Sequence, residues 1–198
     1  MATSVRRNAA PRGTAGADAE RRLAEFIDKF EPDVRAVIRA ARKAMRRRFP
    51  TAYEMVYDNY NFFVIGYSPT DKPSEALVSI AAAANGVGVC FLRGATLPDP
   101  QGLLRGGGKQ TRFLRLDAPG VLGRPEVEAL LTAAVAQSPK PFRERGKLEL
   151  VIRSVSAKQR PRRRSVAKTP ARKATPRTAA VARGPRQRAV TAPARRSR

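Results

Sequence analysis

Apolar residues in the first quarter of the chain recur at the spacing of one helix face. Four of them stand at i, i+3, i+4 and i+7, which predicts a first helix with one apolar stripe. Pro32 ends this helix or begins a second one, because proline fits a first helical turn but not a helix interior. The second helix runs to Arg46, Arg47 and Arg48, which complement its dipole. A solvated helix end is the preferred interpretation of these arginines, and a ligand site is the alternative. The two stripes are Leu23, Phe26, Ile27 and Phe30, and Val34, Val37, Ile38, Ala41 and Met45.

After Pro50 the pattern changes to short runs of β-branched and aromatic residues with turn signals between them, which predicts strands. Residues 68–74, with two prolines, and the pair Asn85-Gly86 have the composition of hairpin connections. Connections this short cannot make the crossover that parallel strands require, so the sheet is predicted to be mainly antiparallel. The five expected strands lie near residues 52–57, 61–67, 76–82, 87–92 and 111–116.

Pro125 opens a third predicted helix, whose apolar stripe ends before Pro139. The order of helices, five strands and a helix is typical of an α+β layer fold. We therefore expect a five-stranded, mainly antiparallel sheet packed with N-terminal and C-terminal helices, and residues 148–152 are a candidate late edge strand. The most apolar stretch, residues 76–92, contains polar residues and glycines and is shorter than the roughly 20 residues of a spanning helix. It predicts two strands and no membrane span.

The positive charge of the chain is concentrated at its ends. Residues 153–198 contain sixteen Lys and Arg and no acidic residue, and residues 1–17 contain three arginines, which leaves +5 of the net +24 for residues 18–152. All aromatic residues lie between Phe26 and Phe142, and about 135 residues suffice for one hydrophobic core. We expect a disordered N-terminal arm over residues 1–17, a folded domain over residues 18–156 and a disordered basic tail over residues 157–198.

The tail consists mainly of Arg, Lys, Pro, Ala and Thr and has too few apolar residues to offset the entropy of ordering it. Its composition is similar to that of linker-histone tails. Spaced positive charges neutralise phosphates without reading sequence, so we expect nonspecific association with DNA or RNA. The alternative is a solubilising tail that adheres to any polyanion, including anionic membranes. The candidate nucleic-acid residues are Arg160, Arg162, Arg163, Arg164, Lys168, Arg172, Lys173 and Arg177.

The cysteine and histidine content limits the chemistry of the domain. Cys90 is the single cysteine, so no intrachain disulfide forms, and we expect a cytoplasmic protein that associates with the nucleoid if its tail binds DNA. Cys90 lies in an apolar run and is interpreted as a buried, inert thiol. The chain contains no histidine, which excludes imidazole catalysis and imidazole metal ligands.

Residues 89–116 read VCFLRGATLPDPQGLLRGGGKQTRFLRL. This block resembles the YdhG-like domain family of unknown function, and weaker similarity, which includes Glu54, covers residues 19–164. The resemblance implies an α+β fold similar to frataxin and, for at least one relative, a role in handling intracellular iron. The chain departs from many relatives at residues 57–60, where they carry Gly-Met-Pro, and in lacking a histidine before Phe91. The matching residues are Phe91, Arg93, Gly94, Leu97, Pro98, Asp99, Pro100, Leu103, Leu104, Gly106, Gly108, Lys109 and Arg112.

The glycine-rich turn at residues 106–109 is a candidate anion site, because exposed backbone amides and a lysine can cradle an anion. It is not a Walker loop, since five residues instead of four separate Gly102 from Gly108, and Gln110 stands where Ser or Thr would bind magnesium. The alternative is a structural turn in which glycine supplies a positive φ. The candidate anion-binding residues are Arg93, Arg105, Gly106, Gly108, Lys109 and Arg112.

Acidic residues offer weaker candidates. By analogy with frataxin, Glu25, Asp28 and Glu31 are weak candidate iron ligands, because hard cations prefer oxygen. Cations stand among them, so a mixed helix face is the preferred interpretation. Glu54 and Asp58 form an acid/base pair only if their strand bends, because positions i and i+4 of a strand lie about 13 Å apart.

The leading hypothesis is a non-enzymatic YdhG-like domain without a cofactor, associated with nucleic acid through its tail. The alternative is an iron-binding or iron-delivery protein of frataxin type. An enzyme acting on a small phosphorylated ligand is the third hypothesis.

Overall fold

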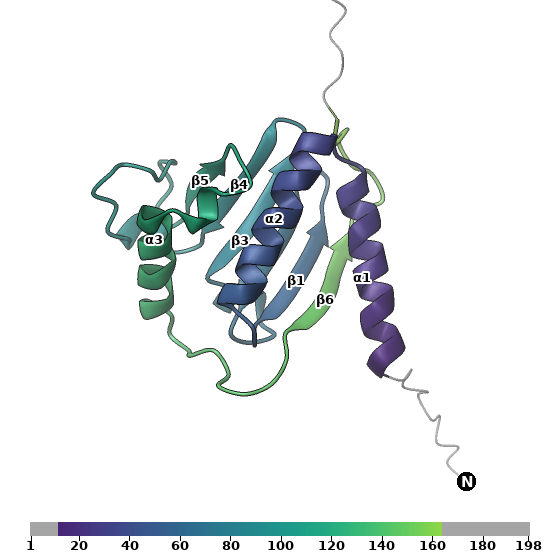
Figure 1. The fold of residues 1–198 in the computed structure, drawn as a ribbon, viewed down its shortest axis with the longest axis horizontal. Helices are drawn as coiled ribbons and strands as arrows, with labels where there is room; N and C mark the ends of the chain where they lie inside the picture. The colour runs from purple at the N-terminus through teal and green to yellow at the C-terminus, as the bar shows by residue number, and fades with distance from the viewer. Residues whose placement is uncertain (1–11, 164–198) are drawn as a thin grey trace, which may run out of the picture. The chain divides into compact units, whose positions relative to one another are not determined.

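The computed structural model describes residues 12–163, which form three α-helices and six strands (Figure 1). Residues 12–17, assigned above to the N-terminal arm, belong to the first helix, and residues 1–11 lie outside the described part. The helices are α1 (Arg12–Asp28), α2 (Pro32–Arg48) and α3 (Pro125–Ala136). The strands are β1 (Tyr53–Asp58), β2 (Phe63–Ser68), β3 (Val78–Ala83), β4 (Gly86–Phe91), β5 (Arg112–Leu116) and β6 (Glu149–Val155).

The six strands form one sheet in the order β5-β4-β3-β2-β1-β6. β1 to β5 follow one another as antiparallel neighbours. β6 corrects the five-stranded expectation, because it joins the free edge of β1 and runs parallel to it, which makes the sheet mixed. A parallel neighbour needs a long crossover, and residues 117–148, which contain α3, supply it.

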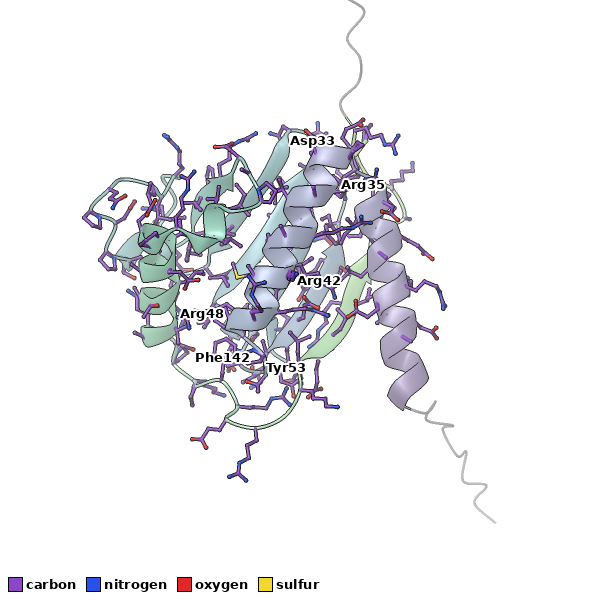
Figure 2. The ribbon with its side chains drawn as sticks, in the orientation of Figure 1. Asp33, Arg35, Arg42, Arg48, Tyr53 and Phe142 are labelled. Atoms are coloured by element: carbon purple, nitrogen blue, oxygen red, sulfur yellow. The ribbon has the colours of Figure 1, made fainter. Side chains whose placement is uncertain are left out.

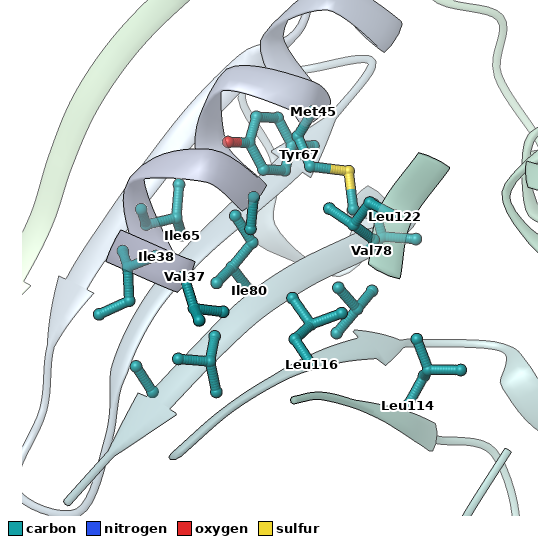
Figure 3. Packing of buried hydrophobic residues seen from close by; sticks show 14 of the residues in the cluster. Val37, Ile38, Met45, Ile65, Tyr67, Val78, Ile80, Leu114, Leu116 and Leu122 are labelled. Atoms are coloured by element: carbon teal, nitrogen blue, oxygen red, sulfur yellow. The ribbon is translucent and has the colours of Figure 1, made fainter. Parts of the chain in front are cut away.

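The three helices cover one face of the sheet (Figure 1), and alternate residues of the strands point toward them. α2 contacts β3 and β4 in the middle of the sheet, and α1 contacts β6 at its edge. The predicted apolar stripes are buried in this layer. Figure 3 shows Ile38 and Met45 of α2 packed in the cluster that also contains Ile65 and Tyr67 of β2.

Two side chains hold the crossover that brings β6 to β1. The ring of Phe142 stacks on that of Phe49, with 4.9 Å between centroids. Arg143 donates from Nε and Nη2 to the carbonyl of Thr51, at 3.2 and 2.9 Å. Its guanidinium carbon also lies 4.7 Å from the centroid of the Tyr53 ring. The connection is therefore anchored to the residues that precede and begin β1.

The opposite face of the sheet carries small side chains in its middle, including Ser79, Ala81 and Cys90. Phe62 and Phe113 border this floor and are 50% and 45% exposed. Residues 76–92 contain the whole β3–β4 hairpin, which confirms the prediction of two strands there. No helix in the described part of the chain is long and apolar enough to cross a membrane.

Candidate nucleic-acid interface

Two of the cations predicted around the glycine-rich turn donate hydrogen bonds to backbone carbonyls. Arg93 donates from Nη1 to the carbonyl of Gln137, just beyond α3, at 3.5 Å. Arg112 donates from Nη1 to the carbonyls of Gly108, at 2.5 Å, and Thr111, at 2.9 Å. The other two predicted cations are exposed and have no ion-pair partner among residues 12–163. They are Arg105 and Lys109.

Other residues of the 89–116 block shape the loop in which they lie. The carboxylate of Asp99 accepts hydrogen bonds from the amides of Leu103 and Leu104, at 2.9 and 2.7 Å. Gly94 packs against Arg112, where a Cβ would lie 2.6 Å from the Arg112 Cβ. Gly106 has a φ of +112°, which favours glycine. A structural role therefore accounts for much of this motif.

The candidate iron ligands at the end of α1 and before α2 are not gathered into a metal site. Asp28 forms ion pairs with Arg39, at 2.7 Å, and Arg35, at 3.6 Å. Within residues 12–163 no group of three or more Asp, Glu, His or Cys side chains is placed to hold a metal ion. Asp28, one of the three candidates, is thus engaged by cations of α2.

Cys90 lies on the open face of the sheet and is partly buried. Burial raises the pKa of its thiol, although a hydrogen bond with Ser79 opposes the shift. A raised pKa disfavours the thiolate, which is the reactive form.

A groove with a volume of about 550 Å³ lies between α1 and α2. We call it the basic groove, because lysine and arginine side chains line it. Its lining includes apolar residues of α1, among them Leu23 and Ile27, and Glu20 is its one acidic residue. All its cations stand on α2, and Figure 2 shows Arg42 projecting toward α1. These cations are Arg39, Arg42, Lys43, Arg46 and Arg47.

A buried carboxylate holds two of these arginines in place. Glu54 points from β1 toward the helices, and its side chain is 0% exposed. Arg42 donates to it from Nε and Nη2, at 3.1 and 2.9 Å. Arg46 donates from Nε at 3.0 Å and from Nη2 at 2.5 Å. The hydroxyl of Tyr67 donates to the same carboxylate at 2.9 Å, so both oxygens of Glu54 accept hydrogen bonds.

These contacts keep Glu54 charged. Burial by itself raises the pKa of the Glu54 carboxyl, but the hydrogen bonds from Arg46 and Arg42 outweigh burial and hold that pKa below its usual range. Burial raises the pKa of Tyr67 well above its usual range, and the neighbouring Glu54 adds to this shift. Glu54 therefore acts as an ionised anchor and Tyr67 as a neutral donor.

Glu20 completes the neutralisation of the two anchored arginines, with ion pairs of 2.8 Å to Arg42 and 2.5 Å to Arg46. Lys43 and Arg47 are exposed, and neither has an ion-pair partner among residues 12–163. The groove therefore offers uncompensated positive charge at these two residues.

A second arrangement, which we call the tail root, consists of residues 156–163 packed against the β1–β2 hairpin. Arg162 is 5% exposed and donates from Nη2 to Asp58, at 2.8 Å, and from Nη1 to the carbonyl of Asn61, at 2.9 Å. Lys29, directly after α1, donates to the other oxygen of Asp58, at 2.6 Å. The amide of Arg160 donates to the carbonyl of Tyr60, at 2.9 Å.

The tail root corrects the assignment of Arg162 to a nucleic-acid-binding tail, because its guanidinium is buried and engaged by Asp58. Residues 157–163 were also assigned to the tail, but the structure shows contacts with the folded domain. Arg160 and Arg163 are exposed, as a role in binding requires. The remaining tail candidates lie outside the described residues, namely Arg164, Lys168, Arg172, Lys173 and Arg177.

Glu54 and Asp58 do not form an acid/base pair. Each carboxylate is buried on the helix side of β1 and is held by its own cations. The groove was not predicted from the sequence, although a ligand site at Arg46 and Arg47 was the alternative to a solvated helix end. Its signal was the spacing of Arg39, Arg42 and Arg46, which places the three on one side of a helix.

In comparisons with known proteins, no family model, no curated protein and no solved structure matched the chain.

Proposed function

We propose that this chain is a non-enzymatic protein that associates with nucleic acid without sequence preference, chiefly through its basic C-terminal residues. The observation that carries the proposal is the run of eleven Lys and Arg, with no acidic residue, over residues 164–198. A protein that neutralises phosphates with such charges gains affinity from counterion release. We also propose that its folded domain is YdhG-like, a hypothesis supported by the motif at residues 89–116.

The folded domain adds exposed cations of its own. Lys43 and Arg47 beside the basic groove, and Arg160 and Arg163 at the tail root, have no ion-pair partner among the described residues. Contacts with phosphates fix a protein on nucleic acid without reading its sequence. Iron binding has weaker support, because Asp28 is engaged by Arg39 and Arg35.

The test compares the full chain with a truncation after Arg163, which removes eleven Lys and Arg and retains the tail root. Fluorescence anisotropy with a labelled DNA duplex should give a Kd of roughly 1–100 μM for the full chain at physiological salt. The truncated chain should bind at least about ten-fold more weakly, because counterion release falls with the number of phosphates neutralised. Equal affinity of the two chains would refute the tail as the binding element.

A matched control separates charge from sequence. A variant in which residues 164–198 are shuffled keeps the composition and the charge of this segment. It should bind the duplex as tightly as the natural chain, because binding through phosphates does not depend on the order of the cations.

A further inference from the structure

A hollow at the tail root has the side chains of a nucleobase site. Its volume is about 490 Å³, within the range of roughly 300–1,000 Å³ that small-ligand sites occupy. The hollow lies between the tips of the β1–β2 and β3–β4 hairpins and residues 160 and 161. Its lining includes Asn61, Phe62, Asn85, Arg160 and Pro161.

Three kinds of group meet in this hollow. Phe62 is 50% exposed, so its ring is available for stacking. The side-chain amides of Asn61 and Asn85 have no hydrogen-bond partner among the described residues, and an amide both donates and accepts. Arg160 is exposed and has no ion-pair partner among residues 12–163. In a nucleotide site, an aromatic ring stacks on the base, amides bond to its polar edge, and a cation contacts the phosphate.

The surroundings strengthen this match. Tyr60, next to the hollow in sequence, is 52% exposed and is held through its carbonyl by the amide of Arg160. Lys158 and Arg163 are exposed cations of the same segment. Asp58, the nearest acidic residue in sequence, is buried and neutralised by Arg162 and Lys29. The residues around the hollow are therefore aromatic and cationic.

We propose that this hollow binds a base of single-stranded DNA or RNA, with Phe62 stacking on the base and Arg160 contacting the phosphate. The proposal rests on the proposed function, because the basic residues that follow Arg163 supply most of the affinity for the strand. A duplex keeps its bases stacked on one another, so it cannot offer a base face to Phe62. The hollow thus gives the protein a preference for single strands that the tail alone does not provide.

The test measures anisotropy with a labelled oligothymidylate of about 20 nucleotides and with a duplex of equal length. Phe62→Ala and Phe62→Leu should each weaken single-strand binding roughly ten-fold, since stacking contributes that order per base. Both variants should leave duplex affinity unchanged. Phe113→Ala, which removes the other half-exposed phenylalanine of the open face, should change neither affinity.

Arg160→Ala should make the negative slope of log K against log salt shallower by about 0.7 for the single strand, as the loss of one phosphate contact predicts. Phe62→Ala should leave that slope unchanged. Thermal unfolding confirms that each variant is folded.

The outcomes separate the two proposals. Unchanged single-strand affinity in both Phe62 variants, or an equal loss in Phe113→Ala, overturns the hollow while the tail proposal stands. Unchanged duplex affinity after truncation at Arg163 overturns the tail proposal instead. If the full chain binds neither probe, both proposals fail.

Discussion

Glu54 connects the interior of the domain to its basic surface. A carboxylate removed from water costs several kcal/mol unless ion pairs and hydrogen bonds compensate. Here Arg42, Arg46 and Tyr67 saturate it. The same contacts fix the two arginines along the wall of the groove, so one buried residue stabilises the fold and positions surface charge.

Replacement of Glu54 by Gln should destabilise the domain by roughly 3 kcal/mol, because two arginines lose the charge that balances them. Tyr67→Phe, which removes one neutral donor to the same carboxylate, should cost only about 1 kcal/mol. Urea unfolding followed by circular dichroism measures both values. An equal loss in the two variants would contradict a dominant role for the charge.

The natural chain and the Glu54→Gln variant also test how the stability of the domain depends on pH. Because the pKa of Glu54 is lowered in the folded state, its contribution to stability is fully present above the unfolded pKa of about 4.3. It is lost as pH falls through the lower folded pKa. The difference in unfolding free energy between the natural chain and Glu54→Gln should therefore shrink below about pH 4. A difference that stays constant down to pH 2 would argue against an ionised Glu54.

At the scale of elements, the tail root ties the C-terminal end of the domain to the β1–β2 hairpin. Asp58 is shared by Arg162 and Lys29, and Gln159 accepts a further hydrogen bond from Lys29 at 2.9 Å. Residues beyond β6 thus complete the surroundings of a buried carboxylate.

Truncation after Ser156 should destabilise the domain by about 3 kcal/mol relative to truncation after Arg163. The shorter chain leaves Asp58 without its buried partner Arg162, and such losses typically cost 3–5 kcal/mol. Lys29, which stays in place, lowers the expected cost. Arg162→Ala in the longer chain is the matched control and should reproduce most of the loss in denaturant unfolding. If both truncations unfold at the same urea concentration, the tail root does not contribute to stability.

The elements that were predictable from the sequence are those with a local signature. The stripes of α1 and α2 predicted these two helices, and Asn85-Gly86 predicted the β3–β4 hairpin, because periodicity and turn chemistry are properties of neighbouring residues. The parallel pairing of β6 was not predictable in this way. It depends on contacts such as Arg143 with Thr51, which lie 92 positions apart.

The roles of the charged residues also could not be predicted locally, because they depend on partners far away in the sequence. Arg162 stands in a run of arginines whose composition indicates a solvated tail, yet its partner Asp58 is 104 positions away. Arg46 was interpreted as part of a solvated helix end. The local sequence could not show that Glu54, on a distant strand, engages it. A local pattern shows that residues are charged, whereas their partners decide which of them are available to a ligand.

At the scale of the whole chain, charge is distributed unevenly. Residues 18–152 carry +5 of the net +24, and the structure shows many of their cations engaged in ion pairs. The segment after Arg163 contains eleven Lys and Arg and no acidic residue to compensate them. Affinity for a polyanion should therefore depend on this segment, and its dependence on salt should report how many phosphates are neutralised.

If the full chain neutralises about six phosphates of duplex DNA, log K should fall with log salt with a slope near −5. Truncation after Arg163 should make this slope shallower, at about −2, which corresponds to two phosphate contacts made by the domain. Anisotropy titrations at several salt concentrations give both slopes, and Phe62→Ala serves as the control because it removes no charge. A slope near zero for the full chain would show that binding is not electrostatic. An unchanged slope after truncation would place the phosphate contacts on the folded domain, with Lys43 and Arg47 as the first residues to substitute.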